Sequence, residues 1–217
     1  MAQEERLAVP ASAPIPLRSP YTAAVSAALR ARRAALDVAL GEMDLRSKGI
    51  ARAASLLVTT ICAGHKVLVA GNGGSAAEAQ HFAGELVGRF KRERSAYPVL
   101  SLTVDTSIIT AIANDYSYHD VFARQVAALG QPGDLFVAIS TSGASENLIR
   151  AVDAAHQRSM PVIGITGDRR SQLERAADLT IRVPVVDTAI AQELHTMIVH
   201  ILCDIAEKEL AASERGI

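Results

Sequence analysis

The fold is decided by the stretch Lys66-Val67-Leu68-Val69-Ala70-Gly71-Asn72-Gly73-Gly74-Ser75. An apolar run ends there in small polar residues, and a stretch with helical spacing follows. Residues 135–145 repeat this pattern, because the apolar run Leu135–Ile139 ends in Ser-Thr-Ser-Gly-Ala-Ser. A strand that passes into a helix through such a loop directs unpaired backbone N–H groups at one point, which favours an anion. Two such loops in one sheet predict a phosphorylated ligand.

Neither loop matches the common nucleotide-binding motifs. The first lacks the lysine of a Walker loop, and Gly-Asn-Gly-Gly-Ser at 71–75 differs from G-x-G-x-x-G. A nucleotide is therefore not the first ligand that we expect. The formal net charge of −1 also argues against a nucleic acid or a membrane surface as a partner.

Short apolar runs alternate with helical segments along most of the chain. The runs are Val67–Ala70, Val99–Val104, Leu135–Ile139, Val162–Ile165 and Leu179–Val183, and the helical segments are about Ala76–Phe90, Ser107–Asn114, Asp120–Leu129, Glu146–Arg158 and Ser171–Ala176. This order predicts an α/β fold with three layers, in which a doubly wound, flavodoxin-like parallel sheet of five strands is covered on both faces. In such sheets ligands bind outside the carboxyl ends of the strands, where both polar loops lie.

Helices are predicted at both ends of the domain. Two lie between Ser19 and about Ala63, the second beginning near Gly49, and a long one covers about Ala189 to Ala211. The patterns Ser75-x-x-Glu78 and Ser171-x-x-Glu174 each predict a capping box at a helix start.

The first residues resemble neither a domain nor an export signal. Residues 1–20 contain four prolines and no apolar signal core, so we expect a flexible tail over 1–18 before a single domain over 19–217. No apolar run approaches the roughly 20 residues that span a bilayer. Cys62 and Cys203 lie in apolar helical stretches without metal-type spacing, which predicts buried free thiols in a reducing, cytoplasmic compartment.

Two pairs of polar residues lie on otherwise apolar helices. His81 and Glu85 are four residues apart and share a helix face, as do Gln192 and His200, which are eight apart. One interpretation is a buried site with a carboxylate base, an imidazole acid and a divalent transition metal, since these donors suit such an ion. The other is that both pairs lie on solvated helix faces.

Other polar residues have two interpretations each. Asn114 and Asp115 either end a helix or bind sugar hydroxyls. The basic run Arg89, Lys91, Arg92 and Arg94 is typical of a solvated face, with Arg89 as the exception because it lies one turn beyond Glu85. The remaining histidines are expected to be structural or exposed; they are His65, His119, His156 and His195.

Taken together, five motifs in this order resemble the phosphoheptose isomerases, which have the sugar-isomerase (SIS) fold. The motifs are Gly-Asn-Gly-Gly-Ser at 71–75, Gln80-His81-Phe82-Ala83-x-Glu85-Leu86, Ala113-Asn114-Asp115, Ile139-Ser140-Thr141-Ser142-Gly143-x-Ser145 and Gln192-Glu193-x-His195-x4-His200. The resemblance runs from about Tyr21 to Leu210. It implies isomerisation of sedoheptulose 7-phosphate to a D-glycero-D-manno-heptose 7-phosphate through an enediol.

The resemblance also implies roles for particular residues. Glu85 would be the base and His200 the acid. The substrate and its phosphate would be bound by Asn72, Gly73, Gly74, Ser75, Arg89, Asp115, Ser140, Thr141, Ser142, Ser145 and Gln192. In some members zinc is held at the positions of His81, Glu85, Gln192 and His200, and members form homotetramers whose active sites are shared between chains.

One departure and two alternatives stay open at this point. Many members have Arg-Ile before the Gln-Glu pair, where this chain has Ile190-Ala191, and this bears on the substrate range. The chain could instead be a non-catalytic SIS protein, either a sugar-phosphate sensor or a partner of the replication initiator. It could also be an SIS enzyme for amino-sugar phosphates or ether cleavage. Glu85 and His200 favour the isomerase, although a cation on Glu85 would weaken it as a base.

Overall fold

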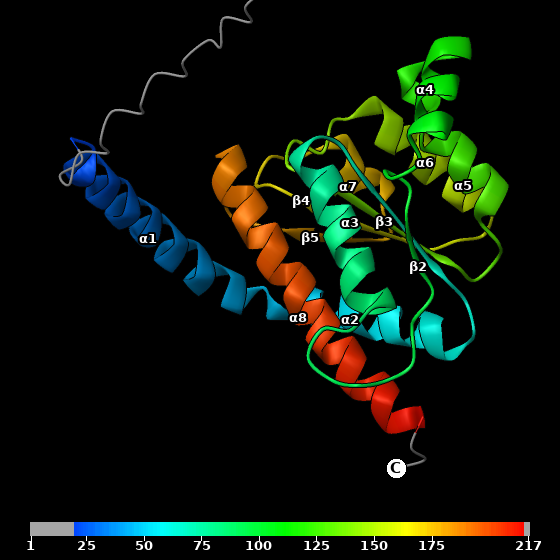
Figure 1. Cartoon of the computed structure of the whole chain (residues 1–217), viewed down its shortest axis with the longest axis horizontal. Helices are drawn as coiled ribbons and strands as arrows, with labels where there is room; N and C mark the ends of the chain where they lie inside the picture. Colours follow the sequence, from blue (N-terminus) through cyan, green and yellow to red (C-terminus); the bar gives the residue numbers. More distant parts are fainter. Residues whose placement is uncertain (1–19, 215–217) are drawn as a thin grey trace, which may run out of the picture.

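The computed structural model describes residues 20–214 and has a five-stranded parallel sheet at its centre (Figure 1). The strand order is β2-β1-β3-β4-β5, and every neighbouring pair is parallel. The strands are β1 (Val67–Gly71), β2 (Val99–Ser101), β3 (Leu135–Ser140), β4 (Val162–Thr166) and β5 (Leu179–Arg182). The predicted fold class is therefore confirmed, with β2 shorter than expected. The predicted tail over 1–18 lies outside the described residues.

Alternating strand residues build two separate cores on the two faces of the sheet. Val67 and Val69 face one core, and Leu68 and Ala70 face the other. The first core is covered by α2 (Ser47–Cys62), α3 (Gly74–Val87) and α8 (Thr188–Glu214). The second is covered by α4 (Thr106–Asp115), a 3₁₀ turn (Tyr118–Asp120), α5 (Ala123–Leu129), α6 (Glu146–Gln157) and α7 (Gln172–Ala176). The candidate site residues of α3 and α8 thus lie on the first face.

The two predicted capping boxes have different outcomes. The Ser171 side chain accepts a hydrogen bond from the Glu174 N–H at the start of α7, as predicted. The prediction for Ser75 is wrong, because α3 begins earlier, at Gly74, with Gly73 in the N-cap position. Gly73 has a φ of 57°, which a glycine adopts without strain, so the chain turns into the helix before it reaches Ser75.

The long helices at the two ends of the domain differ in burial. Helix α1 (Thr22–Leu45) buries only Ala39 and Met43, and in Figure 1 it extends away from the rest of the molecule. Helix α8 is long and apolar enough to cross a membrane by length and composition alone. It packs against α2, α3 and β4, however, as the core helix of this domain.

The two cysteines also differ. Cys203 is buried in α8, as predicted, and burial together with the nearby carboxylates of Glu85 and Glu207 raises the pKa of its thiol. Cys62 is exposed, which corrects the prediction of a buried thiol: it is the last residue of α2, and its side chain is exposed although that of Ile61 beside it is buried in the core. Both thiols are free.

Candidate active site

The loop between β1 and α3 is a tight turn whose geometry requires glycine. A Cβ on Gly71 would lie 2.4 Å from the backbone oxygen of Ser75, so a larger residue would displace the first turn of α3. The Ser75 N–H donates to the Asn72 carbonyl at 3.0 Å, and the Ser75 side chain is buried. This turn brings the N-terminus of α3 directly to the carboxyl end of β1.

A second loop lies beside the first, because β1 pairs with β3 and Gly71 is opposite Ile139. Within it the Ser140 hydroxyl accepts from the Gly143 N–H at 3.1 Å and lies 3.4 Å from the Ser145 hydroxyl. Gly143 has a φ of 62°, and a Cβ there would lie 2.2 Å from the Ser171 hydroxyl. Hydroxyl groups and helix N-termini therefore gather at the carboxyl ends of the inner strands β1 and β3, as the sequence predicted.

A side-chain network that the sequence did not reveal joins the two loops. The amides of Asn72 and Asn147 exchange two hydrogen bonds, each 2.9 Å long, and the Tyr118 hydroxyl donates to the Asn72 side-chain oxygen at 2.9 Å. Asn147 is buried in the first turn of α6. A buried amide needs polar partners, so Asn147 holds Asn72 in place between the loops.

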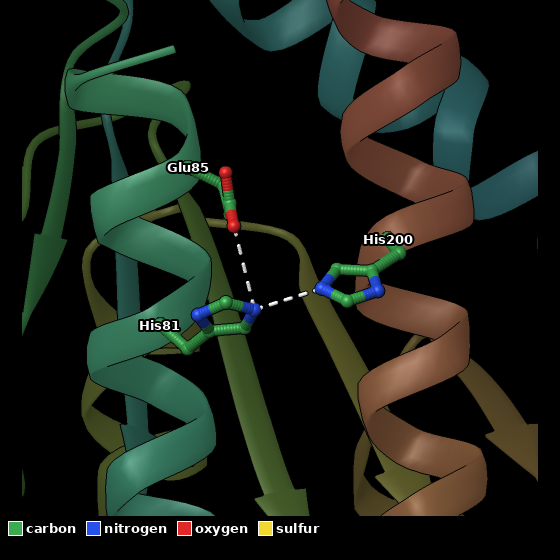
Figure 2. A group of neighbouring side chains, drawn as sticks. All are labelled: His81, Glu85 and His200. Atoms are coloured by element: carbon green, nitrogen blue, oxygen red, sulfur yellow. Dashed lines mark hydrogen bonds and ion pairs between the residues drawn. The ribbon is translucent and has the colours of Figure 1, made fainter. Parts of the chain in front are cut away.

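Three side chains meet between α3 and α8, on the first face of the sheet (Figure 2). His81 and Glu85 come from α3 and His200 from α8. The His81 Nε2 lies 2.8 Å from the His200 Nε2 and 3.5 Å from a Glu85 carboxylate oxygen. One ligand atom from each of the three lies within 4.8 Å of the others. We call this group the His–Glu–His cluster.

The chemistry of the cluster is that of an acid–base or metal site. Two imidazole nitrogens 2.8 Å apart form a hydrogen bond only if one carries the proton and the other accepts it. The Glu85 side chain is 20% exposed, so a ligand can reach it although it is partly shielded from water. Two imidazoles and one carboxylate are also a donor set that suits a divalent transition metal.

Comparison with known proteins agrees with this geometry. Residues 32–167 match the SIS domain family model. A phosphoheptose isomerase from Thiobacillus denitrificans is 50% identical over 178 residues, which cover 81% of this chain and 90% of that protein. One from Coxiella burnetii is 48% identical over 174 residues, with 79% and 87% covered. The chain belongs to the phosphoheptose isomerase family.

Solved structures of the family superpose on most of the chain. The phosphoheptose isomerase GmhA from Neisseria gonorrhoeae is 39% identical, with a TM-score of 0.78, and the match covers 86% of this chain and 98% of that one. The enzyme from Francisella tularensis is also 39% identical, with a TM-score of 0.76 and coverage of 83% and 98%. The fold and the family therefore agree.

Not every residue that the family resemblance assigned to the site lies at the cluster. The Gln192 carboxamide packs against Gly74, because a Cβ added to Gly74 would lie 2.2 Å from the carboxamide nitrogen. Gly74 precedes His81 on α3 by seven residues, so Gln192 lies away from the cluster. The Arg89 guanidinium is 64% exposed and lies 4.0 Å from the Glu93 carboxylate. Asp115, which ends α4, is exposed and accepts from the Asn114 amide at 2.8 Å.

The basic run after α3 is solvated only in part: Arg89 and Lys91 are exposed, as predicted for such a face, whereas Arg94 is buried, which corrects the prediction for that residue. Lys91 and Arg92 pair with Asp204 of α8 at 3.1 and 2.7 Å. The Arg94 side chain is 1% exposed and lies 3.3 Å from the buried Glu207 carboxylate. Burial alone would raise the pKa of Glu207, but backbone hydrogen bonds and Arg94 outweigh it and hold this pKa below its ordinary value.

The remaining histidines are structural or exposed, as expected. His195 is buried on α8, with its Nδ1 3.7 Å from the buried Glu78 carboxylate. His156 lies 3.1 Å from Asp178 on the other face of the sheet. His65 lies 3.9 Å from Asp134, and His119 is exposed.

Proposed function

We propose that this chain catalyses the isomerisation of sedoheptulose 7-phosphate to D-glycero-D-manno-heptose 7-phosphate. The observation that carries the proposal is the meeting of Glu85 and His200 at the His–Glu–His cluster, from helices more than one hundred residues apart in the sequence. The similarity to phosphoheptose isomerases over four-fifths of the chain supports the substrate. Nothing in the site favours a non-catalytic regulatory protein, in which such an acid–base pair would have no task.

The reaction needs two kinds of proton transfer, and the cluster offers a group for each. We assign Glu85 to remove a proton from C1 of the ketose while His200 gives a proton to the C2 oxygen, which forms an enediol. Glu85 then returns its proton to C2, and His200 accepts the proton of the C1 hydroxyl, so that C1 becomes the aldehyde. An acid–base pair placed in this way contributes about 10²–10⁴-fold to the rate.

We assign the phosphate end of the substrate to the two loops at the carboxyl ends of β1 and β3. Their hydroxyls and helix N-termini suit an anion. The residues that we propose here are Gly73, Gly74, Ser75, Ser140, Thr141, Ser142 and Ser145, with Asn72, Asp115, Arg89 and Gln192 for the sugar. Binding energy from the phosphate would hold C1 and C2 beside the acid–base pair.

We further propose zinc as the metal of the site. His81, Glu85 and His200 would hold it, with Gln192 as the fourth donor once its carboxamide leaves Gly74 or when it comes from a second copy of the chain. Their nitrogen and oxygen donors fit the ion. A bound zinc ion stabilises negative charge that develops on oxygen.

A direct assay tests the activity. The purified protein is incubated with sedoheptulose 7-phosphate, and the aldose is separated from the ketose by chromatography, since the two have the same mass. We expect conversion by the protein as isolated and after metal removal and reloading with zinc. If no aldose forms under either condition, the chain is a binding protein and the proposal is wrong.

The exposed apolar face of α1 supports assembly into a homotetramer. Val25 and Leu29 are 54% and 67% exposed on this helix. Beside it lies a groove of about 380 Å³, lined mainly by Leu40, Met43, Ile50, Met197, Ile201 and Ile205. Apolar patches of this kind mark protein–protein contacts. A second copy is the partner that we propose, because the resemblance to the family implies a homotetramer.

Sedimentation equilibrium tests the assembly. We expect four times the chain mass of 22.9 kDa, and a smaller species for the variant Leu29→Lys. A monomer at all concentrations would contradict the proposal. The free thiols of Cys62 and Cys203 support a cytoplasmic location for the enzyme.

A further inference from the structure

A buried carboxylate on α8 holds the segment that follows α3. Glu207 is fully buried and accepts three hydrogen bonds, each 2.9 Å long, from the successive backbone N–H groups of Phe90, Lys91 and Arg92. The Arg94 guanidinium lies 3.3 Å from the same carboxylate. A buried charge is stable only when it is paired and hydrogen-bonded. The backbone of this segment is therefore fixed by one side chain of α8.

The partner arginine ties the same segment to the end of α3. Arg94 donates to the backbone carbonyls of Glu85 at 2.8 Å, Gly88 at 2.8 Å and Ser95 at 2.9 Å. The last carbonyls of a helix lack partners within the helix, and Arg94 supplies one to the carbonyl of Glu85. One buried ion pair thus connects α8, the end of α3 and the segment between Gly88 and Arg94.

The held segment places an aromatic ring against the candidate acid. The rings of Phe90 and His200 are stacked, with centroids 5.2 Å apart and an interplanar angle of 30°. The Lys91 ammonium also lies over the Phe90 ring, 4.9 Å from its centroid. The same ammonium pairs with Asp204. The χ2 torsion of histidine is broad, so a stacked neighbour restricts how the imidazole turns relative to His81.

We propose that Glu207 and Arg94 are positioning residues for His200, and that they act through the ring of Phe90. The pair fixes the backbone that carries Phe90, and Phe90 keeps the His200 Nε2 directed at His81 and the substrate. None of the three belongs to the proposed acid–base pair, so their effect on the reaction would be indirect. The inference rests on the proposed role of His200 as the acid.

Phe90 variants test the link between ring and imidazole. The chain has six histidines, so ring signals in a sample with labelled histidine can be assigned from single variants. In Phe90→Leu, which keeps apolar volume without a ring, we expect the ring-current shift of His200 to disappear. We expect kcat to fall about 10–100-fold, as for outer residues that orient a site, with KM nearly unchanged. Phe90→Tyr keeps an aromatic ring at this position and should retain both the ring-current shift of His200 and the wild-type kcat.

A second pair of variants tests the buried carboxylate. Glu207→Gln keeps the shape but puts an NH₂ group where an oxygen accepted N–H groups, so the His200 signal should move toward its position in Phe90→Leu and kcat should fall with it. Glu209→Gln makes the same change at an exposed position of α8 and should leave both unchanged. If Glu207→Gln fails to fold, Arg94→Lys tests the same ion pair: it keeps a positive charge beside Glu207 but lacks the guanidinium that donates to the Glu85 and Gly88 carbonyls, and it should move the His200 signal and lower kcat in the same way.

The two readouts separate this inference from the proposed function. Unchanged His200 signals in Phe90→Leu, or moved signals with unchanged kcat, would overturn the positioning role. Full activity of His200→Ala would instead reject His200 as the acid. In that case the His200 ring-current shift in the Phe90 and Glu207 variants would still report whether these residues set the orientation of the imidazole.

Discussion

The two ends of the candidate site are built in different ways. The phosphate end consists of backbone and short hydroxyl side chains in two loops, whose positions follow from the register of β1 against β3. The chemical end consists of long side chains that α3 and α8 bring together from distant parts of the sequence. Local turn geometry shapes each loop and the pairing of β1 with β3 places the two side by side, whereas the second end exists only when the helices pack correctly.

This contrast implies different sensitivities. In the proposed site a hydroxyl of the loops would be one of several groups around the substrate phosphate, so we expect its loss to weaken substrate binding only in part. The acid–base pair has one member of each kind, so losing either stops a step of the reaction.

Glu85→Gln should have the largest effect. The amide keeps the shape of the side chain but cannot take a proton, so kcat should fall by about 10²–10⁴-fold. Binding of the ketose phosphate, measured by calorimetry, should change little. Glu209→Gln serves as the matched control, and turnover by Glu85→Gln at the wild-type rate would exclude Glu85 as the base.

His200→Ala should reduce both turnover and metal binding. The change removes the candidate acid and one nitrogen of the donor set, and kcat should fall about 10²-fold or more. Zinc content after dialysis should drop below that of the wild type. Should zinc be retained in full, His200 would not be one of its ligands.

Glu207→Gln should lower the free energy of unfolding and change its pH dependence. Breaking a buried ion pair costs about 3–5 kcal/mol. Because the pKa of Glu207 is lowered in the folded state, its contribution is present above its ordinary value of 4.5 and is lost as the pH falls through the folded pKa.

Urea denaturation between pH 3 and pH 7 measures this effect, with these pH limits chosen roughly to bracket that value. The wild type should lose stability on acidification, and Glu207→Gln should show a smaller loss over the same interval. Equal slopes for the two proteins would mean that Glu207 is not held ionised by its surroundings.

Substitutions in the phosphate loops should have the smallest effect. Ser75→Ala and Thr141→Ala each remove one hydroxyl from a group of several, so KM should rise about tenfold, which is the loss of one hydrogen bond to a charged group. The kcat value should change little. A fall in kcat that matched that of Glu85→Gln would show that the two ends do not act separately.

The sequence contains most of the information for the fold and for the phosphate end. Short apolar runs that alternate with helical segments predicted all five strands, and the capping of α7 by Ser171 was visible in the local pattern. Ser75 was misplaced because Gly73, with its positive φ, lets the helix begin earlier than the capping pattern indicates. Errors of this kind shift an element by a residue or two and leave the topology intact.

The chemical end was only half visible. The spacing of His81 and Glu85 places them on one helix face, but whether that face meets water or His200 depends on the packing of α8. The same dependence explains why Arg94 appeared solvated: its partner Glu207 lies more than one hundred residues away. Asn147 gave no signal at all, because a single asparagine at a helix start is ordinary.

Helices α3 and α8 are joined both at their beginnings, where Gln192 lies against Gly74, and at their ends, through Arg94 and Glu207. The cluster lies between these two attachments and over a buried core. Amide protons along this part of α3 and α8 should therefore be among the slowest of the chain to exchange with solvent, opening only when the whole domain unfolds. The catalytic geometry would then persist, before any ligand arrives, for as long as the protein stays folded.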